Sequence, residues 1–456
     1  MQRKWGFPMS YRSLAAFVFA LCGSLAAPAA GASQNITLDA RLAQPVMKDG
    51  VASKNYLRVG LGGCRPEPAQ NRTPVNVAFV IDRSGSMQGL RIAQAREAAV
   101  MAVNRLQPND IASVVIFDQS VDVLIPAQPV ADPNLFSDLI RRVNARGSTA
   151  IHAGVLAGAA EVRKFHAPHR LNRVVLLSDG QANVGPARPE EFAVLGRGLL
   201  AEGISVSTIG LGLGYNEDLM LVLARSSDGN HAFARDPTDL IAIFNREFSD
   251  VLASCAQTVS IDIELKPGVR AVRALSRDGA ITGSKAQFRL NQVYAATEHY
   301  VLLEVELDRE LAVAGERELG TVKVAYTQAP SGARQALTAA VRGRFTASEA
   351  EVKAGADTKV AEAVVEQVVL ERSRQAVVLR DKGKFDEAQT LLKQNALDIR
   401  TYAASVKTPN AQLLDLGRQY DALGAQPAPT SAQQLGEQRK MLRYLQTPAA
   451  GAATRY

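Results

Sequence analysis

Five oxygen-bearing side chains, in three separate stretches of the chain, are of the types that bind a hard divalent cation. They are Asp82, Ser84, Ser86, Thr149 and Asp179. The first three alternate in the run DRSGS, so in an extended loop their side chains can point the same way. Carboxylate and hydroxyl oxygens suit Mg²⁺ or Mn²⁺, and Ca²⁺ accepts the same donors. The carboxylate and two hydroxyls of Asp82, Ser84 and Ser86 therefore predict a metal site that the later segments, with Thr149 and Asp179, could complete.

Two buried strands are expected to position the two acids. The apolar run 77–81 ends at Asp82, and the run 174–177 is followed by Ser178 and Asp179. Apolar runs of this length without a turn signal are typical of strands in a parallel sheet. With right-handed crossovers and the common strand order 3-2-1-4-5-6, the first and fourth strands are neighbours where the order reverses, and ligands bind there. This rule brings Asp82 and Asp179 together, with Thr149 on a loop that can reach them.

The whole segment 73–254 alternates between strand and helix patterns, which favours a doubly wound sheet. Strands are expected at 76–82, 111–117, 121–125, 172–178, 204–210 and 231–234, and helices at 90–106, 133–143, 149–164, 189–202, 216–225 and 237–253. The link 118–120 is too short for a crossover, so the strand at 121–125 must run antiparallel at a sheet edge.

The motif and its setting resemble the von Willebrand factor type A (vWA) domain. Its metal-ion-dependent adhesion site has the pattern Asp-x-Ser-x-Ser, a distant Thr and a distant Asp, matched here by Asp82, Ser84, Ser86, Thr149 and Asp179. The resemblance implies a Rossmann-like α/β domain whose cation keeps one position open for a carboxylate of a partner protein. It also implies that the site can be coupled to displacement of the last helix, here 237–253.

Other readings of these residues are weaker. Asp82 and Asp179 could each cap a neighbouring helix, but capping does not explain why both fall at the switch point. A dehalogenase-type phosphatase needs a second acid two residues after the first, where this chain has Ser84. A hydrolase is supported only by His166 and His169 in the sequence HAPH, which is weak evidence for zinc. We therefore expect no enzymatic activity.

The flanking segments have different patterns. Residues 33–72 and 255–346 alternate in short strands separated by turn signals, which predicts a β-sandwich that both segments build. Residues 347–423 have helical spacing and predict a helical hairpin, and 424–456 predict a flexible tail with room for a short helix. The fold class is thus α/β: a doubly wound vWA domain inserted beside a β-sandwich, followed by a C-terminal helical region. This layout is distantly similar to inter-alpha-trypsin inhibitor heavy chains.

The first 32 residues have the pattern of a signal peptide: Arg3, Lys4 and Arg12, an apolar run at 14–21 and the small residues Ala30-Gly31-Ala32. The apolar run is too short to span a bilayer, and no later segment is long enough. Export to the periplasm or the extracellular space is expected. The net charge of +7 is interspersed along the chain, so the sequence gives no nucleic-acid-binding stripe.

Removal of the leader leaves two cysteines, Cys64 and Cys255, just outside the two ends of the vWA-like segment. Domain ends are often close in space, and similar folds have their ends tied by a disulfide, so we expect these two to be bonded in an oxidising compartment. Two unrelated buried thiols are the alternative.

Together these patterns predict an exported adhesion or assembly protein that binds a partner's carboxylate through its metal. An accessory subunit of a membrane or secreted enzyme or channel complex would use the same site and differs only in the partner.

Overall fold

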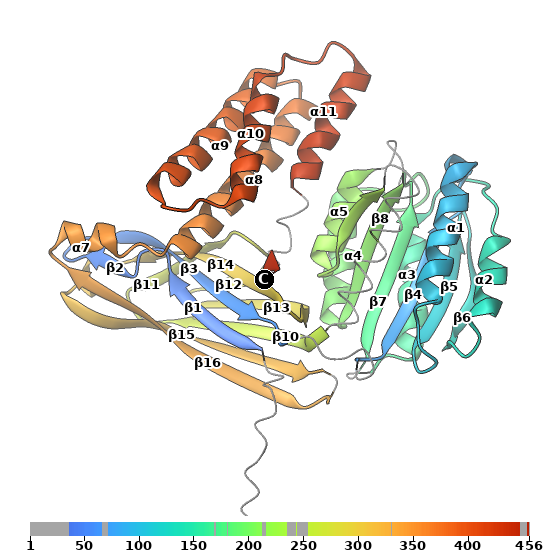
Figure 1. Cartoon of the computed structure of the whole chain (residues 1–456), viewed down its shortest axis with the longest axis horizontal. Helices are drawn as coiled ribbons and strands as arrows, with labels where there is room; N and C mark the ends of the chain where they lie inside the picture. Colours follow the sequence, from blue (N-terminus) through green and yellow to red (C-terminus); the bar gives the residue numbers. More distant parts are fainter. Residues whose placement is uncertain are drawn as a thin grey trace, which may run out of the picture. The chain divides into compact units, whose positions relative to one another are not determined.

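The computed structural model describes residues 36–65, 72–167, 170–179, 181–211, 216–234, 243, 254–329, 331–446 and 454–455. The predicted signal peptide, His169 and, apart from Ile243, the predicted helix at 237–253 lie outside these residues. The described chain forms an α/β domain, two further β-sheets and a set of C-terminal helices (Figure 1). No helix within it has both the length and the apolar character needed to cross a membrane.

One six-stranded sheet forms the centre of the α/β domain. Its strands are β4 (Val75–Asp82), β5 (Ile111–Phe117), β6 (Val121–Pro129), β7 (Leu171–Ser178), β8 (Ile204–Leu211) and β9 (His231–Ala234). The spatial order is β6-β5-β4-β7-β8-β9, so the predicted order is confirmed and the first and fourth strands are neighbours. β6 pairs antiparallel with β5, as expected, and continues four residues beyond the predicted end.

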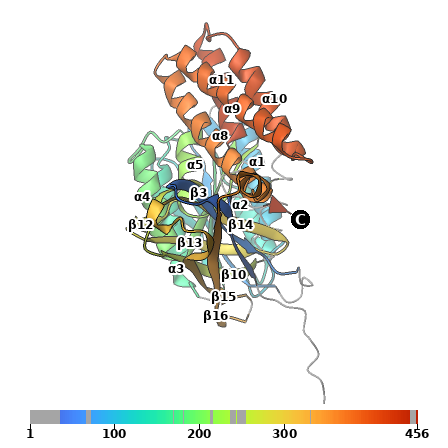
Figure 2. The same ribbon diagram turned by 90° about the vertical axis from the view of Figure 1, so that its left-hand side faces the viewer.

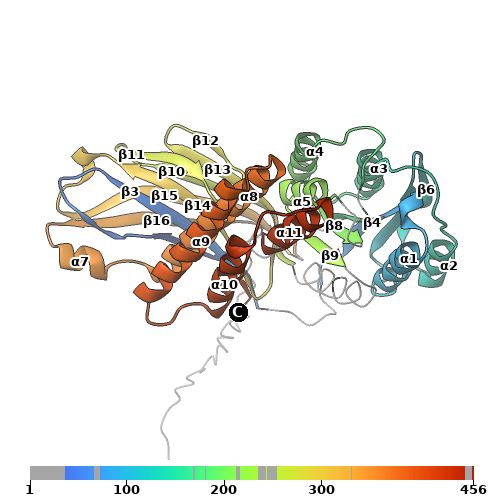
Figure 3. The same ribbon diagram turned by 90° about the horizontal axis from the view of Figure 1, so that it is seen from above.

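Helices cover both faces of this sheet (Figure 3). They are α1 (Leu90–Val103) and α2 (Pro133–Arg141) on one face, and α3 (Ile151–Lys164), α4 (Pro189–Ala201) and α5 (Glu217–Ser226) on the other. Successive side chains of β4 point to opposite faces. Phe79 accordingly packs in the core under α1 and α2, and Val80 in the core under α3. Both are fully buried, which explains the unbroken apolar run in the sequence.

Two antiparallel sheets enclose a second core. Their strands are β1 (Thr37–Leu42), β2 (Val46–Lys48), β3 (Ser53–Gly62), β10 (Ser254–Leu265), β11 (Val269–Ala274), β12 (Ala280–Thr282), β13 (Lys285–Tyr294), β14 (Thr297–Leu307), β15 (Gly315–Gln328), β16 (Arg334–Thr346) and β17 (Thr454–Arg455). One sheet has the order β1-β3-β14-β11, with β17 on β14, and the other has the order β12-β13-β10-β15-β16-β2, where the β16–β2 pair alone is parallel. Leu57 and Val301 of the first sheet share a core with Ile261 and Val322 of the second. Strands from before and after the α/β domain therefore build one sandwich.

A disulfide links the two chain segments that enter and leave the α/β domain. Cys64 follows β3, Cys255 lies in β10, and their sulfur atoms are 2.03 Å apart with a Cα–Cα distance of 5.8 Å. The two cysteines are 191 residues apart in the sequence, and every described element of the α/β domain lies between them.

The C-terminal region is larger than the predicted hairpin. It contains α7 (Glu349–Ala354), α8 (Thr358–Asp381), α9 (Phe385–Ser405), α10 (Ala411–Ala425) and α11 (Ala432–Leu445), of which α8 to α11 lie side by side (Figure 2). Gly383, with φ +74°, turns the chain between α8 and α9. Tyr420 of α10 and Leu442 of α11 are fully buried in one core with Leu392 of α9, so the later helices belong to the same bundle.

Candidate functional site

Asp82 ends β4 and is fully buried. Its Oδ1 accepts a hydrogen bond from the backbone N–H of Ser84 (2.8 Å), and its Oδ2 accepts one from the Ser178 hydroxyl. Burial raises the pKa of Asp82 to about 6; the bonds from Ser178 and Ser84 oppose this rise, and the nearby charge of Asp179 adds to it. The site therefore contains two carboxylates whose negative charges interact.

The two serines connect Asp82 to Asp179. A short 3₁₀ turn, η2 (Gly85–Met87), follows Ser84, and it brings the Ser86 Oγ to 3.1 Å from the Ser84 Oγ. Ser86 then donates a hydrogen bond to Oδ1 of Asp179 (2.8 Å). Ser84 and Asp179 are buried, whereas Ser86 is exposed. Four of the five predicted residues thus form one continuous chain of contacts that reaches the surface at Ser86.

Thr149, the fifth predicted residue, is held between the other two loops by its backbone. Its N–H donates to the side chain of Asn183 (2.7 Å), and its carbonyl accepts from the N–H of Asn183 (3.1 Å), on the loop that follows Asp179. Gly85 N–H donates to the carbonyl of Gly147 (2.9 Å), which joins this loop to the loop of Asp82. Gly147 has φ +73°, and a Cβ there would lie 1.8 Å from the Gln119 side chain, so the position needs glycine.

Asp118 supports these loops, although the sequence analysis did not single it out. It directly follows β5, is fully buried, and lies 3.0 Å from Nε of both Arg83 and Arg146. Burial alone would raise the pKa of Asp118, but hydrogen bonds from Ser120 and Arg146 and the charge of Arg83 lower it to about 2. Asp118 therefore stays ionised and ties the loop after Asp82 to the loop before Thr149. Its position just after β5, beside Asp82 at the end of β4, is the signal that could have revealed it.

Arg91 was also missed by the sequence analysis. It lies in the first turn of α1, and its Nη1 is 2.9 Å from Oδ2 of Asp179 and 2.9 Å from the carbonyl oxygen of Ser86. Both carboxylate oxygens of Asp179 therefore accept a hydrogen bond, one from the Ser86 hydroxyl and one from the Arg91 guanidinium group. Nothing in the sequence pattern of α1 distinguishes Arg91 from an ordinary surface arginine.

The donor set fits a hard divalent cation. The residues in contact offer two carboxylates and two hydroxyls, and Thr149 on the neighbouring loop has a third hydroxyl; all of these are oxygen ligands. The described residues hold no group of three or more His, Cys, Asp or Glu side chains that could bind a metal, so a site here depends on the hydroxyls. Asp82 and Asp179 are both buried and are joined through Ser84 and Ser86, and two neighbouring carboxylates of this kind are the arrangement that a bound cation stabilises.

The comparison with known families agrees with this geometry. Residues 76–246 match the family model of the von Willebrand factor type A domain. This part of the chain is a vWA domain. vWA domains commonly bind divalent cations at the site whose pattern these residues match, and the domain implies a protein-binding, adhesion-type function.

One relative matches a longer part of the chain than the vWA domain alone. The chain is 26% identical over 298 residues to an uncharacterised protein of Synechocystis sp., covering 63% of this chain and 69% of that protein. It is 31% identical over 170 residues to human inter-alpha-trypsin inhibitor heavy chain H3, covering 36% of this chain but only 19% of H3. The distant similarity to the heavy chains is thus confirmed, within a small part of their length.

The fold outside the vWA domain also has a solved counterpart. The structure described as von Willebrand factor type A from Catenulispora acidiphila aligns with a TM-score of 0.72 at 15% identity, over 92% of this chain and 97% of its own. At this identity the likeness shows the fold alone. A vWA domain combined with these flanking elements is therefore an arrangement found in another protein.

Two of the described histidines pack against other side chains of the vWA domain, whereas His166 of the HAPH sequence is exposed. His152 packs edge-on against Phe192 (5.7 Å between ring centroids), and burial lowers its pKa. His231 lies 2.8 Å from the Thr208 hydroxyl, but this pair is inside the domain, where burial lowers the pKa of His231 to about 4 and Thr208 is fully buried. A hydroxyl at that depth cannot reach a substrate.

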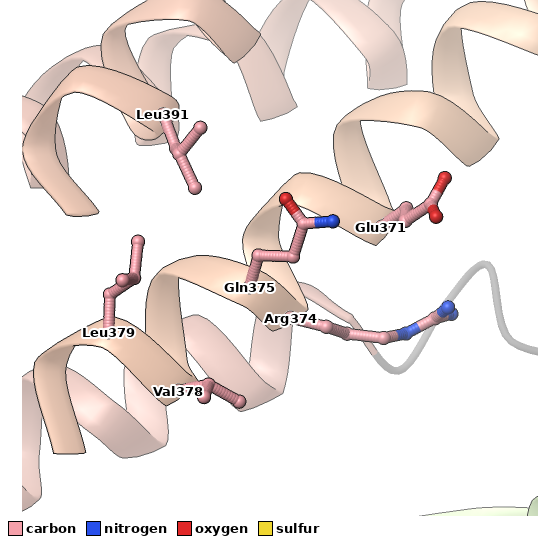
Figure 4. A pocket seen from close by; sticks show the side chains of 6 residues that line it. All are labelled: Glu371, Arg374, Gln375, Val378, Leu379 and Leu391. Atoms are coloured by element: carbon pink, nitrogen blue, oxygen red, sulfur yellow. The ribbon is translucent and has the colours of Figure 1, made fainter. Parts of the chain in front are cut away.

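A hollow lies between α8 and α9 (Figure 4), and its lining has few side chains that could react with a ligand. It is lined by Glu371, Arg374, Gln375, Val378, Leu379 and Leu391. The Glu371 carboxylate is already paired with Arg273 (2.7 Å). The hollow therefore offers no nucleophile and base for a reaction.

Proposed function

We propose that this is an exported, non-enzymatic binding protein whose vWA domain holds Mg²⁺ or Mn²⁺ and captures a carboxylate of a partner protein. The observation that supports it most is the continuous chain of contacts from Asp82 through Ser84 and Ser86 to Asp179. These residues come from the carboxyl ends of two neighbouring strands, where doubly wound sheets bind ligands.

The protein's own residues prepare the site for a cation. Asp82 and Asp179 supply negative charge from a buried position, where electrostatic attraction is screened least. The hydroxyls of Ser84, Ser86 and Thr149 supply neutral oxygens, so the donor set carries only two negative charges. A divalent cation bound there supplies a Lewis-acidic position for a further acidic ligand. Because Ser86 is the exposed member of the chain, a partner would approach from its side.

Three observations support a binding role over catalysis. The His231–Thr208 pair is buried, His152 packs against a phenylalanine, and the hollow beside α8 has no reactive pair. Neither histidine pair nor the hollow supplies an accessible nucleophile with a base beside it, and the exposed Ser86 hydroxyl that bonds Asp179 belongs to the proposed metal site.

Metal titration of an Asp179→Ala variant tests the proposal. We expect the parent to bind Mg²⁺ and the variant to lose measurable binding in calorimetry while its circular dichroism spectrum stays that of the parent. Asp138→Ala is the matched control, because Asp138 is exposed on α2, away from the chain of contacts. Unchanged Mg²⁺ affinity in Asp179→Ala would exclude the assigned site.

Capture of partners tests the second half of the proposal. The parent, Asp179→Ala and Asp138→Ala proteins are immobilised and exposed to an extract of the source cells in Mg²⁺ and again in EDTA. A true partner is retained in Mg²⁺ by the parent and by Asp138→Ala, and is released by EDTA. A partner retained equally by Asp179→Ala would show that binding does not use the metal site. The identity of the captured protein separates an adhesion role from an accessory-subunit role.

A further inference from the structure

Arg91 places a fixed positive charge on the same carboxylate that would help to hold the metal. Its Nη1 bridges Oδ2 of Asp179 and the carbonyl oxygen of Ser86, at 2.9 Å from each. The Asp179 side chain is 3% exposed and that of Arg91 is 38% exposed, so the pair lies at the boundary between the buried site and the solvent. Ion pairs with one buried partner are screened less than pairs at the open surface.

This contact changes the charge balance of the site. The site holds two buried carboxylates, Asp82 and Asp179, and Arg91 neutralises Asp179 without any metal. A divalent cation that uses Asp179 must then either displace the guanidinium group or remain close to its positive charge. Either outcome weakens metal binding relative to a site without Arg91.

We infer that Arg91 is an intramolecular cation that competes with the divalent metal for Asp179 and thereby sets the metal affinity of the vWA domain. This inference rests on the proposed function, since it concerns the same site. The guanidinium group holds Asp179 in place when the metal is absent, and its charge opposes the metal when the metal binds. The affinity for Mg²⁺ is therefore held below what the five oxygen ligands alone would provide.

Two substitutions separate the charge of Arg91 from its hydrogen bonds. Arg91→Gln removes the charge and keeps donor groups that can bond Asp179, whereas Arg91→Lys keeps the charge. Arg105→Gln is the matched control, because Arg105 is exposed just after α1 and makes no side-chain contact with the described site. We expect Arg91→Gln to bind Mg²⁺ about tenfold more tightly than the parent, since removing one nearby charge shifts an ionic equilibrium by about one power of ten. Arg91→Lys and Arg105→Gln should stay within about twofold of the parent.

Thermal unfolding of the same full-length variants gives a second readout. In EDTA, Arg91→Gln should melt at a lower temperature than the parent, because Asp179 has lost its neutralising partner. In saturating Mg²⁺ the difference should close or reverse, because the tighter metal binding now stabilises the folded variant. An arginine with a purely structural role would lower the melting temperature by the same amount in both conditions.

The outcomes distinguish this inference from the proposed function. If Mg²⁺ binds parent and Arg91→Gln with equal affinity, and both lose it on Asp179→Ala, the metal site stands and the role of Arg91 is refuted. Weaker binding by Arg91→Gln than by the parent refutes it as well. If neither the parent nor Arg91→Gln binds Mg²⁺, the metal site and the inference are both refuted.

Discussion

Replacing Asp118 by Asn should destabilise the vWA domain by about 2–3 kcal/mol at pH 7, although Asp118 is not one of the five proposed ligands. The magnitude follows from its pKa, which lies at about 2 in the folded protein against an ordinary value of 3.8. One unit of pKa corresponds to about 1.4 kcal/mol, so the folded environment stabilises this charge by about 2.5 kcal/mol. The side chain is fully buried, so solvent screening does not reduce this value greatly.

The pH dependence of this effect has a definite sign. Because folding lowers the pKa of Asp118, its contribution to stability is complete above about pH 4 and is lost as the pH falls through about 2. The gap between parent and Asp118→Asn should therefore shrink to about half at pH 3. Urea unfolding of the full chain at pH 7 and pH 3, followed by circular dichroism, measures both values.

Asp122→Asn is the matched control for this experiment. Asp122 also pairs with Arg83, but its side chain is 54% exposed, so its loss should change stability by less than about 0.5 kcal/mol. Asp118→Asn should also weaken Mg²⁺ binding, because Asp118 joins Arg83 to Arg146 and thereby fixes the two loops of the site. Equal destabilisation by the two variants, or a gap that does not narrow at pH 3, would refute the assigned role of Asp118.

Three further perturbations have expected outcomes. Gly158→Ala should cost about 1–3 kcal/mol in urea unfolding, because a methyl group there would lie 2.4 Å from a valine side chain of β4. Burial and the nearby charge of Arg277 lower the pKa of His299 to about 4, so its contribution to stability falls with acidity between about pH 6.5 and 4. Going from pH 8 to pH 5 should therefore destabilise the parent by about 2 kcal/mol more than His299→Leu in the same assay. The double variant Cys64→Ser/Cys255→Ser should lose about 2–5 kcal/mol, and a reductant should lower the melting temperature of the parent to that of the variant.

The sequence predicted the centre of the site better than its surroundings. Asp82 and Asp179 could be placed together because each ends a buried apolar run, and the strand-order rule makes those two strands neighbours. Arg91 could not be placed, because its contact depends on how the first turn of α1 approaches Asp179, and helical spacing does not encode that approach. Asp118 could have been found by the same rule as Asp82, since it also directly follows a strand of the sheet.

In the flanking regions, too, the sequence predicted the elements better than the way they pack. Alternation and turn signals predicted strands on both sides of the vWA domain, and these strands form one sandwich. The segment 347–423 was predicted to be a hairpin but contains α7 to α10, whereas the short helix expected after Gly424 is present as α11. The burial of Leu442 and Leu445 in one core with Leu392 shows that α11 belongs to the bundle. A sparse apolar pattern therefore allows a short helix to be predicted but does not identify the helices it packs against.

The bond between Cys64 and Cys255 makes the vWA domain a covalent side loop of the main chain. Mechanical tension applied between the two ends of the protein crosses this bond directly from β3 to β10. The inserted domain bears none of that load and can keep its fold while the rest of the molecule is stretched. Only a pull applied to the domain itself, through a bound partner, would strain its sheet.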